Sequence, residues 1–212
     1  MGRTLAAEAK RPGYHHGDLA RALVEAAEAL VAQRGPAHLT LREAARLAGV
    51  SVAAPYRHFA DREALLAAVL AKGFLELAHE MEAGRGSQAG ALDALSAVGE
   101  ALVRFSARKP SIYRLMFGPE CDKGKHPELL AAGHEALSVP ARAVDVCAEA
   151  GLLATADRQA VVLAGWSLCH GLSSLHADGM LAALGPLDVQ RTSKKLIRLL
   201  FEGVVRPEKV AP

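Results

Sequence analysis

The sequence predicts an all-α fold with a small N-terminal domain followed by a larger C-terminal one. Hydrophobic residues make up 51% of the chain but aromatic residues only 4%, so the core has to be aliphatic. Alanine and leucine, which favour helices, dominate nearly every segment, whereas alternating runs of strand-forming residues are missing. Apolar residues instead recur every three or four positions between glycines and prolines, which is the pattern of amphipathic helices.

The first predicted helix follows a polar N-terminal stretch. Residues 1–16 contain glycine, proline, charges and two histidines without periodicity, and we expect them to form a flexible arm. From Asp18 to Val31 the apolar residues share one helical face, and Gly35-Pro36 then ends the helix.

A short helix and a tight turn are predicted next. Thr40 and Glu43 have the Thr-x-x-Glu spacing of a capping box, which predicts a helix over 41–48. Gly49 follows, and a glycine adopts the positive φ angle of such a turn without steric cost. Two helices joined in this way form a helix-turn-helix, although a helical hairpin in another kind of bundle has the same pattern.

The second helix of this pair, predicted over 52–59 with Ser51 as its cap, is unusually polar. Tyr56, Arg57 and His58 lie together on barely two turns that have few apolar residues to bury. Such a helix faces a polar partner, and the major groove of DNA accepts a helix with small front residues and hydrogen-bonding flanks. Asp61 is then expected to cap a longer helix, whose apolar face is formed by Leu65, Leu66, Val69, Leu70, Phe74, Leu77 and Met81.

The stretch over 17–77 resembles the DNA-binding domain of the tetracycline-repressor family of transcriptional regulators. The residues that carry the resemblance are the run Thr40 to Ala45, the run Ala48 to Ser51, and Tyr56-Arg57-His58-Phe59-x-Asp61-Arg62-x-x-Leu65. The resemblance implies a three-helix helix-turn-helix domain over 17–77. It also implies that 78–212 form a ligand-binding and dimerisation domain.

The resemblance further implies roles for individual side chains on DNA. Arg57 is expected to contact guanine, because its fork matches O6 and N7, and Val52 and Ala53 lie nearest the bases. Further contacts to phosphate, base edges or helix ends are implied for Thr40, Arg42, Ser51, Tyr56, His58 and Arg62. His58 has an alternative role as a cap or core histidine, and Tyr56 as a wedge between helices. Pro55 departs from the aliphatic residue usual at its position, and we expect it to delay or distort the second helix.

The C-terminal half is divided by glycine and proline into five further predicted helices. We expect Gly84, Gly86, Ser87 and Gly90 to break the chain, with helices following at about 90–108, 110–117, 127–150, 157–178 and 188–205. Pro140 is expected to kink or split the third of these. The helices near 157–178 and 188–205 are apolar over wide faces, which predicts a four-helix interface in a homodimer, with an intrachain core as the alternative.

A small-molecule site is predicted inside this domain. The sequence around Trp166 and His170-Gly171 resembles a Trp…His-Gly signature of one branch of tetracycline-type regulators, which implies an inducer-binding domain. The expected pocket walls are Leu102, Phe105, Tyr113, Met116, Phe117, Leu163 and Trp166, with His134, Cys169, His170 and Ser173 as polar contacts. Core packing explains each of these residues about as well.

Three other functions are alternatives. An enzyme is disfavoured because Cys169 and His170, as helix neighbours, point about 100° apart and no third catalytic partner is recognisable. A metal-responsive regulator would use Cys121, His126, Cys147, Cys169 and His170, none of which shows a ligand spacing. A helical interaction protein without DNA affinity is the third alternative.

Composition and targeting signals agree with a cytoplasmic regulator that needs no cofactor. Residues 1–62 hold nine Lys/Arg against six Asp/Glu, a mild basic bias that suits phosphate. The three cysteines form no disulfide framework, and neither a signal peptide nor a membrane span is recognisable. We expect a homodimeric repressor that binds a palindromic double-stranded DNA operator and is released by a small apolar inducer.

Overall fold

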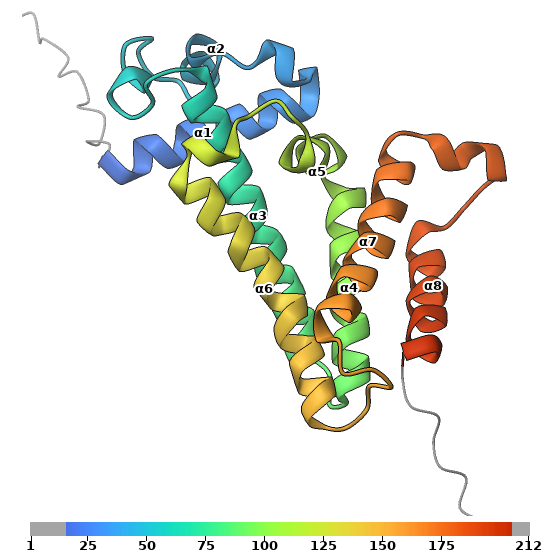
Figure 1. The fold of residues 1–212 in the computed structure, drawn as a ribbon. Coiled ribbons are helices and arrows are strands. Elements are labelled where there is room, and N and C mark those ends of the chain that lie inside the picture. Colours follow the sequence, from blue (N-terminus) through green and yellow to red (C-terminus); the bar gives the residue numbers. More distant parts are fainter. Residues whose placement is uncertain (1–15, 205–212) are drawn as a thin grey trace, which may run out of the picture.

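The structure is a computed structural model, and it describes residues 16–204 (Figure 1). These residues form eight α-helices and four short 3-10 helices, with no strand in this part of the chain. The all-α prediction is therefore confirmed. Apart from His16, the predicted N-terminal arm lies outside the described residues, as does the last residue of the helix expected over 188–205.

The N-terminal helices lie together at one end of the molecule. They are α1 (His16–Arg34), α2 (Leu41–Leu47) and the beginning of α3 (Arg62–Gly86). The Thr40 hydroxyl accepts the Glu43 N–H at 3.1 Å, and the Asp61 carboxylate accepts the Ala64 N–H at 2.8 Å. The N-caps predicted at Thr40 and Asp61 are thus present. Gly49 has a φ angle of 70°, as the predicted turn requires.

The segment after this turn differs from the predicted α-helix over 52–59. It forms a turn that leads into the 3-10 helix Pro55–Arg57, and Ser51 contributes its carbonyl to the Ala54 N–H at 3.0 Å. Pro55 has no N–H to donate and its ring crowds the preceding turn, which disfavours an α-helix over this short segment. The expectation of a regular helix was wrong, whereas the distortion expected from Pro55 is confirmed.

Five longer helices form the rest of the chain and match the predicted ranges within a few residues. They are α4 (Ala91–Arg108), α5 (Pro110–Phe117), α6 (Pro127–Glu149), α7 (Arg158–Ala177) and α8 (Val189–Val204). Short 3-10 helices that the sequence pattern did not indicate occupy Pro36–His38, Lys123–Lys125 and Met180–Leu184.

The glycine-rich break predicted after the third long helix is present, but it begins later than Gly84. α3 continues through Gly84 to Gly86 and α4 begins at Ala91, and Gly84 lies so close to α4 that a Cβ there would be 3.2 Å from the Ala97 carbonyl oxygen. Tertiary packing there outweighs the weak helix propensity of glycine, about 1 kcal/mol. α6 runs as one helix through Pro140, so of the kink or split expected there the split is absent.

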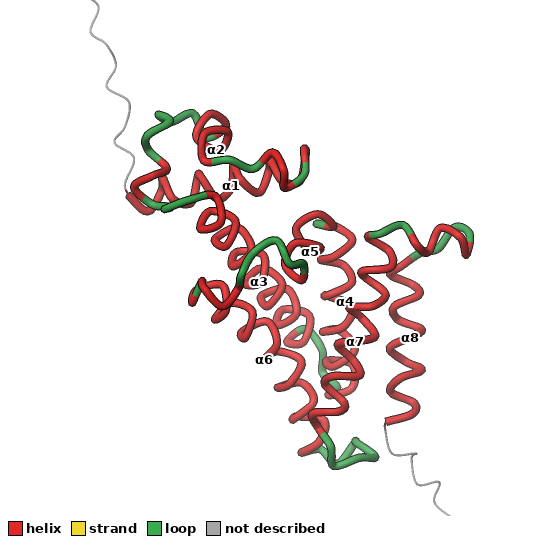
Figure 2. The backbone as a smooth tube through the Cα atoms, turned by 45° about the horizontal axis from the view of Figure 1, so that its top comes forward, coloured by secondary structure: helices red, strands yellow, loops and turns green. Residues whose placement is uncertain are grey.

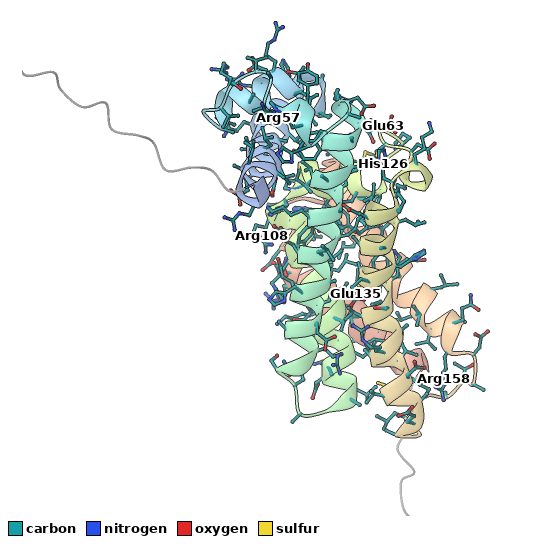
Figure 3. The ribbon with its side chains drawn as sticks, turned by 90° about the vertical axis from the view of Figure 1, so that its left-hand side faces the viewer. Arg57, Glu63, Arg108, His126, Glu135 and Arg158 are labelled. Atoms are coloured by element: carbon teal, nitrogen blue, oxygen red, sulfur yellow. The ribbon has the colours of Figure 1, made fainter. Side chains whose placement is uncertain are left out.

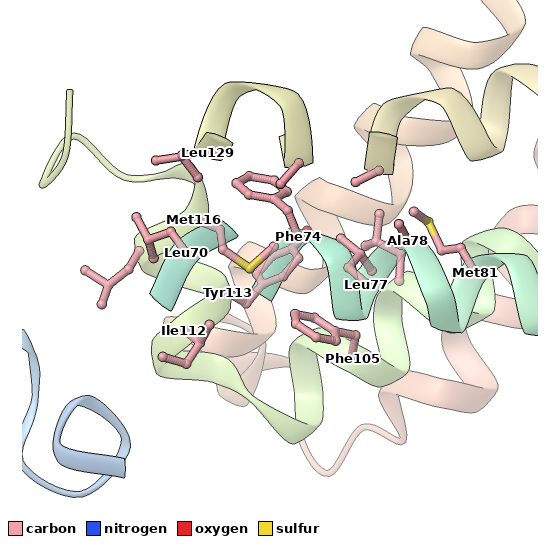
Figure 4. Close-up of a cluster of buried hydrophobic side chains, with 14 of the residues drawn as sticks. Leu70, Phe74, Leu77, Ala78, Met81, Phe105, Ile112, Tyr113, Met116 and Leu129 are labelled. Atoms are coloured by element: carbon pink, nitrogen blue, oxygen red, sulfur yellow. The ribbon is translucent and has the colours of Figure 1, made fainter. Parts of the chain in front are cut away.

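α3 is the central element and joins both ends of the molecule. It runs beside α6 along most of its length, while α4 packs against α3, α6, α7 and α8 (Figures 1 and 2). The predicted apolar face of α3 is buried throughout, and Figure 4 shows Phe74, Leu77 and Met81 meeting residues of α4, α5 and α6. No helix within residues 16–204 is long and apolar enough to span a membrane.

Candidate nucleic-acid interface and ligand cavity

The polar surface at the α1–α2 end is built on a small apolar support. Ala45 and Pro55 are buried, as is Phe59, so α2 and the 3-10 helix pack closely and the side chains between them turn outward. The Val50 N–H donates to the Ala45 carbonyl at 3.0 Å across the turn. The local sequence therefore holds a short polar segment away from the core.

The side chains of this segment are available to a partner. Tyr56 is 61% exposed and Val52 46%, and Arg57 is exposed as well, among the N-terminal helices (Figure 3). Ser51 and Ala53 are also exposed, whereas His58 is half-buried. A shallow open depression brings together the predicted residues of α2, the 3-10 helix and α3, namely Thr40, Arg42, Tyr56 and Arg62, with Leu41, Ala60 and Asp61.

Arg62 has structural contacts that the sequence did not indicate. Its Nε donates to the Leu39 carbonyl at 2.9 Å and a terminal nitrogen donates to the Pro36 carbonyl at 2.8 Å. These bonds fasten the start of α3 to the chain before α2. Arg62 therefore positions the polar surface in addition to bordering its depression.

A small apolar cavity lies in the C-terminal domain, between α3, α4, α6, α7 and α8. Its volume is about 40 Å³, and its wall is almost entirely hydrocarbon. Of the eleven predicted ligand residues, Leu102, Trp166 and Cys169 line it. The remaining wall comes from Met81, Leu95, Val98, Gly99, Pro140, Val144, Val161, Val162, Gly165, Ile197, Leu200 and Phe201.

An aromatic cluster next to the cavity contains other predicted residues. The ring centroid of Phe117 lies 4.5 Å from that of His170, 4.9 Å from that of Tyr113 and 6.0 Å from that of Trp166. The Tyr113 hydroxyl and His170 Nδ1 are hydrogen-bonded at 2.8 Å. Burial raises the pKa of Tyr113 and lowers the pKa of His170, so both groups are neutral near neutral pH.

The other predicted ligand residues lie elsewhere. Phe105, Met116 and Ser173 are fully buried in the helix packing, whereas His134 on α6 and Leu163 on α7 are exposed. None of these five contributes to the cavity wall. Burial raises the pKa of the Cys169 thiol to about 12, so the cavity offers no thiolate.

Part of the cavity wall belongs to α8, none of whose residues was among the predicted ligand contacts. The wide apolar face of this helix was assigned to a dimer, yet Ile197 is buried against α4. Gly99 makes this possible, because a Cβ there would lie 2.9 Å from both Cys169 Sγ and Ile197 Cδ1. The sequence feature that could have indicated this close approach is Gly99, a lone glycine within the amphipathic pattern of α4.

An apolar surface does remain on the outer side of α7 and α8. Leu163 is 56% exposed, Leu175 46% and Leu199 63%, and the two helices form one edge of the molecule (Figures 1 and 2). A Cβ added at Gly171 would meet nothing within 4 Å among the described residues. This edge therefore has room for a closely packed helix.

A network of ion pairs connects the N-terminal helices to the C-terminal domain. Lys109, between α4 and α5, binds Glu28 of α1 at 2.6 Å and also pairs with Glu76 of α3. Lys72 pairs with both carboxylates as well. Burial by itself raises the pKa of Glu28 and Glu76, but hydrogen bonds and charges from the two lysines outweigh it and hold both pKa values below the ordinary value.

The five residues of the metal hypothesis do not converge. Cys147 donates its thiol to the Ala91 carbonyl at 3.3 Å, and Cys169 and His170 belong to the cavity and the aromatic cluster. Cys121 and His126 lie near the start of α3 instead. The metal-responsive alternative therefore lacks a common site.

Together the fold and these surfaces define an all-helical protein with a helix-turn-helix at one end and a cavity-bearing domain at the other. A family model described as "Bacterial regulatory proteins, tetR family" matches residues 23–69, and one described as "Tetracyclin repressor-like, C-terminal domain" matches residues 95–200, half of the chain. The chain belongs to the tetracycline-repressor family. It is therefore a ligand-responsive DNA-binding transcription regulator and not an enzyme.

Solved structures share the whole fold. A protein of unknown function from Rhodococcus sp. RHA1 is 31% identical, with a TM-score of 0.82 and coverage of 92% of this chain and 100% of that one. A putative tetR family transcription regulator from Shewanella sp. PV-4 is 16% identical, with a TM-score of 0.65 and coverage of 89% and 99%. The fatty acid degradation regulator FadR from Bacillus halodurans is 13% identical, with a TM-score of 0.71 and coverage of 86% and 98%. A comparison with curated proteins finds no match.

Proposed function

We propose that this regulator is a cytoplasmic homodimeric repressor, that it binds a palindromic operator, and that a small apolar molecule releases it. The observation that carries the proposal is the pairing of an exposed polar segment over 51–58 with a hydrocarbon-lined cavity in the same chain. The functional units would be 17–77 and 78–212, which the continuous helix α3 joins.

On DNA, Arg57 would read a base edge while its neighbours position the segment. An exposed arginine can bind guanine O6 and N7 with both arms of its fork, and Val52 and Ala53 offer only methyl contacts. Tyr56 and His58 would bind phosphates, together with Thr40, Arg42 and Ser51 around the depression. Arg62 would act chiefly by holding α3 in place.

Dimerisation would use the outer side of α7 and α8. The exposed leucines of this edge would be buried against the same surface of a second copy, which is the isologous arrangement of a two-fold dimer. Two recognition segments would then lie about 34 Å apart, one helical turn of DNA. A palindromic operator follows from that symmetry.

The inducer would have to enlarge the cavity in order to enter it. Ligand sites typically enclose about 300–1,000 Å³, whereas this cavity has room for little more than a few water-sized groups. The hydrocarbon wall selects an apolar ligand. Entry would separate α4 from α7 and α8, so the ligand would bind the enlarged form better than the compact one.

A displacement of α4 would be transmitted to the DNA-binding end through the C-terminus of α4. Lys109 stands at that point and holds both α1 and α3 by ion pairs. A shift of α4 would therefore pull on the two helices that support the recognition segment. A coupling of about 1–3 kcal/mol would be typical for such a regulator.

The test measures binding of the full-length protein to a labelled duplex from its own upstream region by fluorescence anisotropy. We expect saturable binding by dimers, a steep decrease in affinity with salt, and release by one or more members of a panel of alkyl-chain and aromatic hydrocarbons. Failure to bind any sequence from a randomised duplex library more tightly than bulk DNA would contradict the proposal.

A further inference from the structure

Three side chains of metal-ligand type meet where the start of α3 approaches the segment between α5 and α6. Glu63 belongs to the first turn of α3, whereas Cys121 and His126 flank the 3-10 helix Lys123–Lys125. One potential ligand atom from each side chain lies within 4.8 Å of the other two. Figure 3 shows Glu63 and His126 close together at this junction. The fold thus assembles a cysteine, a histidine and a carboxylate from distant parts of the sequence.

The imidazole of His126 has an unsatisfied nitrogen that faces this cluster. Its Nε2 is buried and makes no hydrogen bond to any residue that the structure describes. The nearest acidic oxygen, Oε1 of Glu63, is 3.6 Å away, which is too long for a hydrogen bond. A buried nitrogen without a partner is costly and calls for an explanation. A bound cation between the two groups would provide one.

The spacing agrees with tetrahedral coordination. Zinc binds nitrogen and oxygen at about 2.0–2.2 Å and sulfur at about 2.3 Å, so ligand atoms around it are separated by roughly 3.3–3.7 Å. The 3.6 Å between His126 Nε2 and Glu63 Oε1 falls in this range. Small side-chain rotations would bring Cys121 Sγ, now within 4.8 Å, to the same separation.

The charged neighbours of the cluster are already paired. Lys123 donates to the Gly118 carbonyl at 2.8 Å, and Lys125 pairs with Asp122 at 3.3 Å. The Asp122 backbone N–H donates to Glu63 Oε1 at 3.1 Å, which orients the carboxylate, and Oε1 keeps a second lone pair with which it can ligate an ion. Both lysine ammonium groups are therefore engaged by other oxygens and do not pair with the three candidate ligands.

We propose that Glu63, Cys121 and His126 form a binding site for a zinc ion, with water as the fourth ligand. Zinc accepts sulfur, nitrogen and oxygen together, whereas magnesium and calcium require oxygen ligands and copper(I) prefers sulfur. Because Glu63 starts α3 and the other two ligands precede α6, the ion would fasten the support of the recognition segment to the C-terminal domain. The site does not depend on the proposed repressor function.

The experiment titrates chelator-treated full-length protein with cobalt(II), a spectroscopic substitute for zinc, and then with zinc as competitor. We expect one cobalt per chain, a thiolate-to-cobalt charge-transfer absorption, and displacement of cobalt by zinc. Zinc should also raise Tm, because an ion that binds only the folded state stabilises it. No DNA is present, so failure of the repressor proposal would not affect the result.

Variants identify the ligands. Cys121→Ser should abolish the charge-transfer absorption, and His126→Ala and Glu63→Gln should each weaken zinc binding about 10-fold or more. Cys147→Ser and His134→Ala are matched controls that should keep full binding. If Cys121→Ser fails to fold, the double variant C147S/C169S leaves Cys121 as the single thiol and should retain the absorption. Absence of saturable cobalt binding, or a thiolate absorption that survives in Cys121→Ser, overturns the site.

Discussion

Two regions of this molecule, the helix-turn-helix end and the α7–α8 edge, expose side chains of opposite polarity. At the helix-turn-helix end, exposed Tyr56 and Arg57 are polar and stand on a buried apolar support. At the α7–α8 edge, the exposed residues include Leu163 and Leu199, which cover the outside of a helix pair. A polar surface fits nucleic acid and an apolar one fits a second protein copy, so the difference between the two ends indicates the partner of each.

The largest effect is expected from placing a charge on the apolar edge. Leu163→Asp and Leu199→Asp would bury an unpaired carboxylate in each half of the proposed dimer, at a cost of about 3–5 kcal/mol. Light scattering should then show monomers, and operator affinity should decrease more than about 100-fold. Leu75→Asp is the control, because Leu75 is 53% exposed on α3, away from this edge. Dimers that persist in both variants would place the interface elsewhere.

At the opposite end, Arg57→Ala should weaken operator binding by about 1–3 kcal/mol and relax the preference at one base pair. Tyr56→Phe should weaken binding to all DNA sequences alike, because phosphates carry no sequence information. Arg104→Ala, on α4 and 47% exposed, serves as the distant control. Selection from a randomised duplex library measures all three, and an unchanged base preference in Arg57→Ala would remove that residue from readout.

The ion pairs of Lys109 join the α4–α5 junction to α1 and α3. Lys109→Met should therefore lower the free energy of unfolding by about 1–2 kcal/mol near neutral pH. Glu28 and Glu76 have lowered pKa values in the folded state, so their contribution is present above the ordinary carboxyl pKa of 4.5 and is lost as pH falls through the lowered values. The difference between wild type and variant should therefore shrink as the pH falls below the ordinary carboxyl pKa of 4.5 and through the lowered values. Arg108→Met, which breaks the more exposed pair with Glu80, is the control for urea unfolding.

The smallest expected effect is a change in stability, in a comparison of one glycine from the helix-turn-helix with one from the C-terminal domain. Gly49 in the turn and Gly133 in α6 both have open space where a Cβ would stand, but only Gly49 has a positive φ angle. Gly49→Ala should lower stability by about 1–2 kcal/mol, whereas Gly133→Ala should raise it by about 1 kcal/mol through better helix propensity. Thermal unfolding of both variants provides the measurement, and a stabilising Gly49→Ala would contradict the assigned turn.

Apart from the α-helix expected over 52–59, the sequence by itself determined the α-helices, the caps at Thr40 and Asp61 and the tight turn at Gly49, because these depend on interactions between residues a few positions apart. The spacing of Thr40 and Glu43, the Asp61 cap and the apolar face of α3 all lie within single elements, and even the distortion at Pro55 follows from its own ring and missing N–H.

Only the tertiary structure decided which apolar residues enclose the cavity, which face outward and which titratable groups meet. α8 divides its wide apolar face between the cavity, where Ile197 approaches α4 across Gly99, and the surface, where Leu199 is exposed. Glu63 and His126 come together across more than fifty residues of intervening chain. Periodicity shows that a helix has an apolar face, but the identity of the helix packed against each part of that face is set by contacts between distant segments.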